Sequence, residues 1–129
     1  MKAYKGLHKN EDGTLMCMDM VYKPGKTYKF DGEIELCKRG FHACHELWQT
    51  WAFYPNNGET AYYEVECGGE IIESDYDDGK FVCSEIKLVK EISMTGVARF
   101  DDAWYFSEGF AKVKLEGKWM LINAKGEFI

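Results

Sequence analysis

The chain has 129 residues and a net charge of −6, and 46% of its residues are hydrophobic while only two are proline. This composition supports one packed domain and excludes a disordered or linker-like chain. No apolar run approaches the roughly 18 residues that a membrane span needs, and the negative charge disfavours direct nucleic-acid binding. Five cysteines at irregular spacing favour a reducing compartment over a disulfide framework, so we expect a cytoplasmic protein with no membrane contact.

The first part of the chain predicts short β-strands separated by turns. Strand character is expected over residues 2–8, 15–22, 27–30 and 41–44, and the turns between them carry Gly, Asn, Asp or Pro. One short helix is expected over residues 46–54, because four apolar residues there share one face at helical spacing and Pro55 follows.

The rest of the chain also reads as strands. Residues 61–67 alternate, so Tyr63 and Val65 should face a core while Glu64 and Glu66 face solvent. A further strand or strand pair is expected over residues 81–92, and a hairpin over residues 110–123. The predicted fold class is therefore α+β: a mostly antiparallel β-sheet with one short helix and a C-terminal β-hairpin.

The C-terminal stretch carries the motif Phe106-Ser107-Glu108-Gly109-Phe110-Ala111 and then Gly117-Lys118-Trp119-Met120. Residues 100–129 thereby resemble one WG-type repeat, with Met120 where the signature glycine stands. The resemblance implies a hairpin unit that stacks on neighbours and carries no catalytic residue.

A single hairpin unit cannot bury enough surface by itself. We therefore expect Trp104, Phe106, Phe110 and Trp119 to pack on the N-terminal part. Residues 1–93 and 94–129 should form two parts of one compact unit.

A second resemblance covers residues 1–93. It rests on the run Cys37-Lys38-Arg39-Gly40-Phe41-His42-Ala43-Cys44, together with residues 1–6 and 22–28. These motifs are similar to a small uncharacterised domain family of bacteria and their phages. The resemblance implies a prokaryotic or phage origin and an intracellular setting, and it supplies no function.

Residues 40–79 contain nine acidic residues and no Lys or Arg. Such a stretch can steer a basic partner, and it can also serve only as a solvated surface. If it binds a partner, the predicted binding residues are Glu64, Glu66, Glu70, Glu73, Asp75, Asp77 and Asp78.

An alternative site involves residues of a different chemistry. His42 and Cys44 lie two residues apart on a predicted strand, where an imidazole could activate a thiol. With Tyr4 and Tyr63 they make up an alternative ligand-binding set. The order of elements resembles ADP-ribosyltransferase folds, which implies a degenerate nucleotide-binding domain, with Lys5 where an Arg of that fold would stand.

The cysteine and histidine residues around position 42 do not predict a metal site. His42 and Cys44 are at i and i+2, and no second ligand pair matches them at the spacing of structural zinc sites. We expect neither a metal nor another cofactor.

The sequence therefore predicts a non-catalytic protein-binding module of bacterial or phage origin. Its partner would be a protein with a basic surface, such as a host nucleic-acid-binding enzyme that the module inhibits in an anti-defence role. The alternative is a small-molecule or nucleotide binder, and a homo-oligomer is left open.

Overall fold

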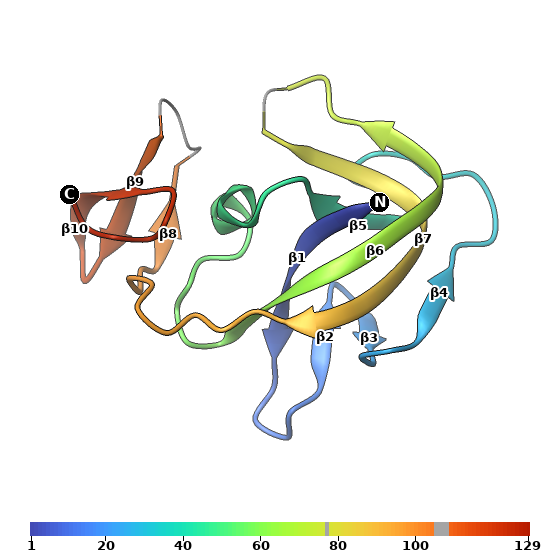
Figure 1. Ribbon diagram of the computed structural model, residues 1–129, viewed down its shortest axis with the longest axis horizontal. Coiled ribbons are helices and arrows are strands. Elements are labelled where there is room, and N and C mark those ends of the chain that lie inside the picture. The colour runs from blue at the N-terminus through green and yellow to red at the C-terminus, as the bar shows by residue number, and fades with distance from the viewer. Residues whose placement is uncertain (77, 105–108) are drawn as a thin grey trace.

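The chain forms two antiparallel β-sheets with a short helix lying between them (Figure 1). The computed structural model describes residues 1–76, 78–104 and 109–129. The predicted predominance of antiparallel β-structure is confirmed. Helix is confined to six residues of the described chain, so the molecule is a small β-rich fold.

Seven strands form the larger sheet, and in chain order they are β1 (Lys2–Lys9), β2 (Leu15–Cys17), β3 (Met20–Tyr22), β4 (Thr27–Lys29), β5 (Phe41–Cys44), β6 (Thr60–Glu73) and β7 (Lys80–Glu91). β1 pairs with β5 and β6, and β7 pairs with the same two strands, so these four strands close into a ring. β2 and β3 extend the sheet from β1, and β4 extends it from β7. Among the described residues, Tyr4 and Cys44 are the one register pair between β1 and β5, which makes this the weakest seam of the ring.

The ring encloses the main hydrophobic core. Along β6 the side chains of Ala61, Tyr63, Val65 and Cys67 are all buried, as the alternation predicted. Tyr62 is also fully buried, although it faces the opposite side of the strand, because it belongs to a second cluster outside the ring. β6 is therefore covered on both faces near its start.

The expected single strand over residues 15–22 is two strands joined by a tight turn. Met18 occupies the left-handed region with φ 57°, and β2 then pairs with β3 from Cys17↔Met20 to Leu15↔Tyr22. No glycine or proline marks this turn in the sequence, and for that reason the strand break was missed.

The expected helix over residues 46–54 is a shorter 3-10 helix, η1 (Leu47–Ala52). Glu46 is extended at its start, and its backbone N–H donates to the Gln49 side chain at 2.8 Å. Trp51 is 1% exposed and anchors η1 in the second hydrophobic cluster.

The C-terminal sheet contains β8 (Asp102–Ala103), β9 (Phe110–Leu115) and β10 (Lys118–Asn123), in the order β10-β9-β8. Glu116 and Gly117 both have positive φ, which suits the two-residue turn between β9 and β10. One face of this sheet carries Val113 and Ile122, which pack with Trp51 and Tyr62 in the second cluster.

The expectation that aromatic residues of the repeat pack on residues 1–93 is wrong for those that the structure describes. Trp104, Phe110 and Trp119 are 62%, 40% and 43% exposed, because they face away from the second cluster. Phe106 lies outside the described residues. The contact is made instead by buried Phe100 and by residues of the inner face, including half-buried Met120.

Candidate functional site

A cleft of about 660 Å³ lies along the seam between β1 and β5. Its walls come from these two strands, the β2–β3 turn, residues 37–40, and the end of η1 with Phe53 and Tyr54. Gly6 permits this arrangement, because a Cβ at position 6 would come within 2.6 Å of the Tyr54 Cβ. The fold thus brings segments that are far apart in the sequence around one opening.

Lys5 is the most unusual residue of the cleft. It is only 3% exposed, and its Nζ donates to the backbone carbonyl of His42 at 2.5 Å. The same ammonium lies 5.4 Å from the centroid of the Tyr22 ring. No carboxylate forms an ion pair with Lys5 within the part of the chain that the structure describes. A buried ammonium without a counter-ion is costly, so the cleft has a local excess of positive charge.

His42 is held as a neutral imidazole beside this ammonium. Burial, reinforced by the charges of Lys5 and Lys80, lowers the pKa of His42 to about 4. Its Nε2 accepts a hydrogen bond at 2.7 Å from the backbone N–H of Cys37, a residue with φ 66°. The neutral ring therefore carries its proton on Nδ1.

The rim of the cleft adds further cations. Lys80 Nζ lies 3.0 Å from Cys37 Sγ and 4.7 Å from the centroid of the Phe53 ring. Lys38 and Arg39 are also part of the rim, and both form ion pairs with Glu35. Asp19, which is exposed, is the one carboxylate among the described lining residues. The field inside the cleft is therefore positive, although the whole chain is acidic.

The inner walls are aromatic and apolar. Tyr22 and Phe30 each make an edge-to-face contact with Phe41, with ring centroids 6.3 Å apart in both pairs. The Tyr54 hydroxyl lies 2.8 Å from Cys17 Sγ, and burial raises the pKa of both Tyr22 and Tyr54. These phenols are neutral at ordinary pH and can serve as hydrogen-bonding groups.

Three of the four residues of the alternative set lie in the cleft. Tyr4, His42 and Cys44 line it, whereas Tyr63 lies in the core of the ring and its hydroxyl donates to Glu91 at 3.2 Å. Burial raises the pKa of Cys44 to about 12, so this residue is a thiol. His42 Nε2 accepts a hydrogen bond from the Cys37 backbone N–H, so in this arrangement it is not available to take a proton from the Cys44 thiol.

Sequence reasoning missed Lys5 as the centre of the cleft. The signal was a lysine at an inward-facing position of a strand, between Ala3 and Leu7, which are both fully buried. A lysine on the buried face of a strand is rare and is therefore a useful marker.

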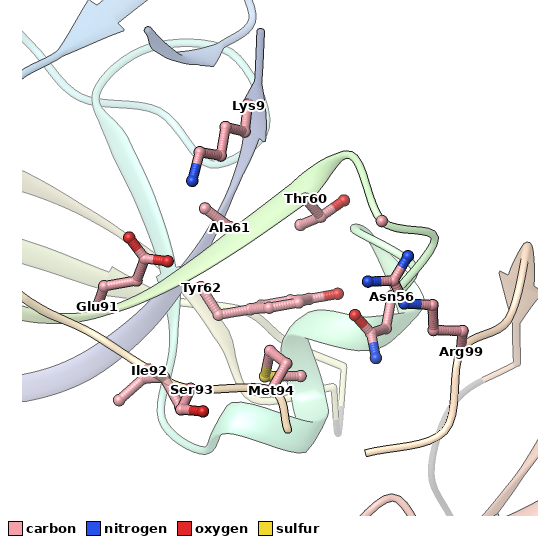
Figure 2. A pocket seen from close by; sticks show the side chains of 11 residues that line it. Lys9, Asn56, Thr60, Ala61, Tyr62, Glu91, Ile92, Ser93, Met94 and Arg99 are labelled. Atoms are coloured by element: carbon pink, nitrogen blue, oxygen red, sulfur yellow. The ribbon is translucent and has the colours of Figure 1, made fainter. Parts of the chain in front are cut away.

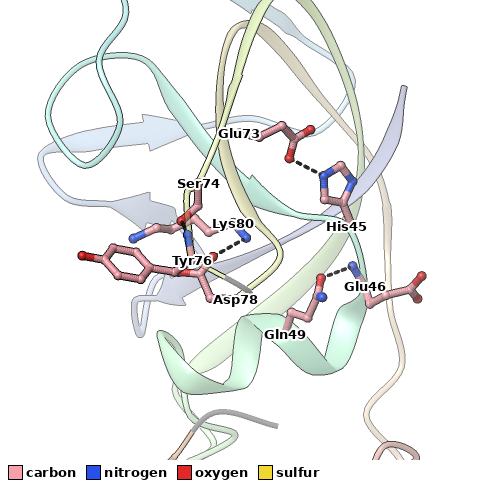
Figure 3. A network of polar contacts seen from close by, with 8 residues as sticks. All are labelled: His45, Glu46, Gln49, Glu73, Ser74, Tyr76, Asp78 and Lys80. Atoms are coloured by element: carbon pink, nitrogen blue, oxygen red, sulfur yellow. Dashed lines mark hydrogen bonds and ion pairs between the residues drawn. The ribbon is translucent and has the colours of Figure 1, made fainter. Parts of the chain in front are cut away.

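The predicted acidic surface is partly neutralised within the chain. Glu64 pairs with Lys2 at 3.2 Å, Glu66 pairs with the amino group of Met1 at 2.5 Å, and Glu73 pairs with His45 at 2.7 Å. Figure 3 shows the His45 and Glu73 side chains pointing toward one another.

The remaining acidic residues lie in the last part of β6 and in the turn between β6 and β7. Glu70 and Asp75 are exposed, and Asp78 accepts a hydrogen bond from the Lys80 backbone N–H at 3.0 Å (Figure 3). Asp77 lies outside the described residues. The predicted partner-binding residues are therefore divided between the start of β6 and its end.

A second cavity, of about 430 Å³, lies where the two sheets are joined (Figure 2). It is lined by Lys9, Tyr62, Glu91 and Arg99, and by buried Asn56, whose Nδ2 donates to the Ala98 carbonyl at 2.9 Å. Its positive and negative side chains give it no single charge preference. Its position at the connection between the sheets favours a structural role.

Two further properties concern metals and membranes. No group of three or more His, Cys, Asp or Glu side chains within the described residues is placed to hold a metal ion. No helix in the described part of the chain has the length and apolar character needed to cross a membrane.

Two family models match parts of the chain. Residues 1–99 match the model of a domain of unknown function (DUF7666), and residues 98–119 match the model of the WG containing repeat. No curated protein and no solved structure matches the chain. The predicted combination of a small uncharacterised domain with one C-terminal repeat is confirmed.

Proposed function

The chain belongs to the DUF7666 family, and we propose that it is a non-catalytic binding domain whose cleft takes a small organic anion. The observation that carries this proposal is Lys5, a buried ammonium without a carboxylate partner among the described residues. A bound anion would supply the missing counter-charge at the bottom of the cleft.

Burial of the Lys5 ammonium destabilises the folded chain. The effective penalty for removing one ion from water is several kcal/mol, and a hydrophobic residue of similar volume would avoid it. The Lys5 hydrogen bond and its contact with Tyr22 recover about 2–4 kcal/mol together. Lys5 therefore adds little net stability to the fold, so stability does not account for a lysine at this position, whereas a role in ligand binding does.

Backbone strain supports the same location. Three described residues other than glycine have positive φ, and two of them, Met18 and Cys37, lie at the rim of the cleft. Met18 and Glu116 each lie in a two-residue turn between paired strands, so the turn accounts for the conformation of both. Cys37 lies in the turn between the bridged residues Glu35 and Arg39, where a positive φ is uncommon for a cysteine. Strained residues tend to gather at ligand-binding sites, so Cys37 at this rim favours a functional cleft.

The test is a titration of the full chain with small anions, followed by amide chemical shifts in NMR spectra. The panel should contain carboxylates, inorganic phosphate and nucleotides. We expect saturable shifts at Lys5, His42 and Lys80, and a loss of binding in Lys5→Met. Lys87→Met removes an exposed lysine of β7 and serves as the matched control, with binding unchanged.

Two results would refute the proposal. One is a panel in which no anion shifts the amides of the cleft at millimolar concentration. The other is binding that is the same in Lys5→Met as in the wild type.

A second candidate function is binding to a protein with a basic surface, in a bacterial or phage cytoplasm. It is supported by the last part of β6 and the turn that follows it. Ile72 and Tyr76 are 37% and 81% exposed there, and Glu70 and Asp75 are exposed as well. An exposed tyrosine next to carboxylates offers an anchor and a steering charge. Inhibition of a host enzyme would be one outcome of such binding.

A further inference from the structure

Among the residues that the structure describes, the buried interior of the cleft holds a single positive charge. Lys5 supplies it, and the adjacent His42 imidazole is neutral at ordinary pH. Lys38 and Arg39 belong to the rim and already have Glu35 as a partner. Lys80 belongs to the rim as well, beside Cys37 and over the Phe53 ring. A buried site is most stable when its net charge is zero, so the group that reaches Lys5 should carry one negative charge.

The hydrogen-bonding capacity of Lys5 also favours a ligand group with one negative charge. An ammonium has three N–H donors, and one of them is used by the His42 carbonyl. Two donors remain for a ligand, and a carboxylate offers two acceptor oxygens with a total charge of −1. A phosphate dianion would bring an additional negative charge into a site with no second buried cation among the described residues.

The walls near Lys5 define the rest of the ligand. Tyr22, Phe30 and Phe41 form a connected aromatic wall, and Met20 packs against the same core. Met18 stands at the mouth of the cleft with 87% of its surface exposed. These side chains favour an apolar chain or ring over a sugar, whose hydroxyl groups would lose hydrogen bonds to water.

We propose that the ligand is an amphipathic monocarboxylate, bound with its carboxylate on Lys5 and its apolar body against Tyr22, Phe30 and Phe41. This inference rests on the proposed function and names the class of anion that the cleft takes. A nucleotide would instead have to place its phosphates beside Lys5, so the two ligand classes can be distinguished by experiment.

The test compares four probes on the full chain by calorimetry at pH 7: octanoate, 1-octanol, octyl phosphate and acetate. Octanoate should bind most tightly. Octanol lacks the charge and acetate lacks the apolar body, so each should bind about tenfold more weakly or worse. Octyl phosphate should also bind more weakly than octanoate, because its second negative charge has no buried partner.

Two lysine variants separate charge recognition from general damage to the fold. Lys5→Met should abolish the preference for octanoate over octanol while octanol still binds, because the apolar wall is intact. Lys87→Met should keep the wild-type preference.

The outcomes distinguish this inference from the function on which it rests. If octyl phosphate or a nucleotide binds in the cleft more tightly than octanoate, the monocarboxylate class is wrong and the anion-binding cleft stands. Equal binding of octanoate and octanol, or an unchanged preference in Lys5→Met, would also overturn the inference. If neither these probes nor any anion of the wider panel binds, both proposals fail.

Discussion

Phe100 is predicted to be the main connection between the two sheets. It follows the family domain directly, is fully buried, and makes an edge-to-face contact with Trp51 of η1, with ring centroids 6.0 Å apart. Its backbone N–H also donates to the Asn56 carbonyl at 3.1 Å. Replacing Phe100 by alanine should leave a cavity between η1 and the C-terminal sheet.

The expected loss of stability is large. Removal of a buried phenylalanine side chain costs about 3–5 kcal/mol, and the aromatic pair with Trp51 contributes about 0.5–1.5 kcal/mol to that loss. A domain of this size is stable by about 5–15 kcal/mol, so Phe100→Ala removes a substantial fraction. With a urea m-value of about 2 kcal/mol/M, the midpoint should fall by about 2 M.

The assay is urea unfolding followed by tryptophan fluorescence and by circular dichroism. Phe110→Ala is the matched control, since Phe110 belongs to the same sheet, is 40% exposed, and should cost about 1 kcal/mol or less. A loss of stability in Phe100→Ala no larger than in this control would contradict the prediction. Wild-type unfolding in two steps, with only one step sensitive to Phe100→Ala, would show that the sheets do not unfold together.

Three further predictions concern single sites. Met120→Gly should lower the free energy of unfolding by about 1–3 kcal/mol, because it removes a side chain that packs on the second cluster and adds backbone freedom to β10. An unchanged melting temperature would contradict this prediction. The His42 pKa is about 4 in the folded state and about 6.5 in the unfolded state, so the free energy of unfolding should fall as the pH drops from 6.5 to 4. The fall should be smaller in His42→Gln, and equal pH profiles of the two proteins in urea unfolding would contradict this prediction. If the chain binds a basic partner, the double variant Glu70→Lys with Asp75→Lys should bind that partner about tenfold more weakly and with a smaller dependence on salt. Equal binding of the partner by the wild type and the double variant would show that these residues contribute only to solubility.

The strands could be predicted from local patterns, and the ring could not. The alternation around Tyr63 and the Glu116-Gly117 turn depend on neighbouring residues, so the sequence shows them directly. The ring depends on pairing of residues 2–8 with residues 60–66, which are far apart in the chain. The burial of Tyr62 depends in turn on η1 and the C-terminal sheet, so no local pattern reveals it.

The candidate site shows the same limit at the level of side chains. His42 and Cys44 attracted attention because of their chemical types, yet the residue that organises the cleft is Lys5. Its position between two buried residues is visible in the sequence, whereas its contacts with His42 and Tyr22 exist only after the ring has closed. The acidic stretch is visible in the sequence, but the sequence does not show which of its carboxylates form ion pairs within the folded chain.

The helix η1 gives the C-terminal sheet a role in shaping the cleft. Trp51 of η1 packs on Phe100, while Thr50 of the same helix and Tyr54 just after it line the cleft. The Tyr62 hydroxyl donates to the Tyr54 carbonyl and ties this wall to the second cluster. A six-residue 3-10 helix has little stability of its own, so its position must come from tertiary packing. The repeat therefore holds one wall of the cleft in place, which lowers the ordering cost when a ligand binds.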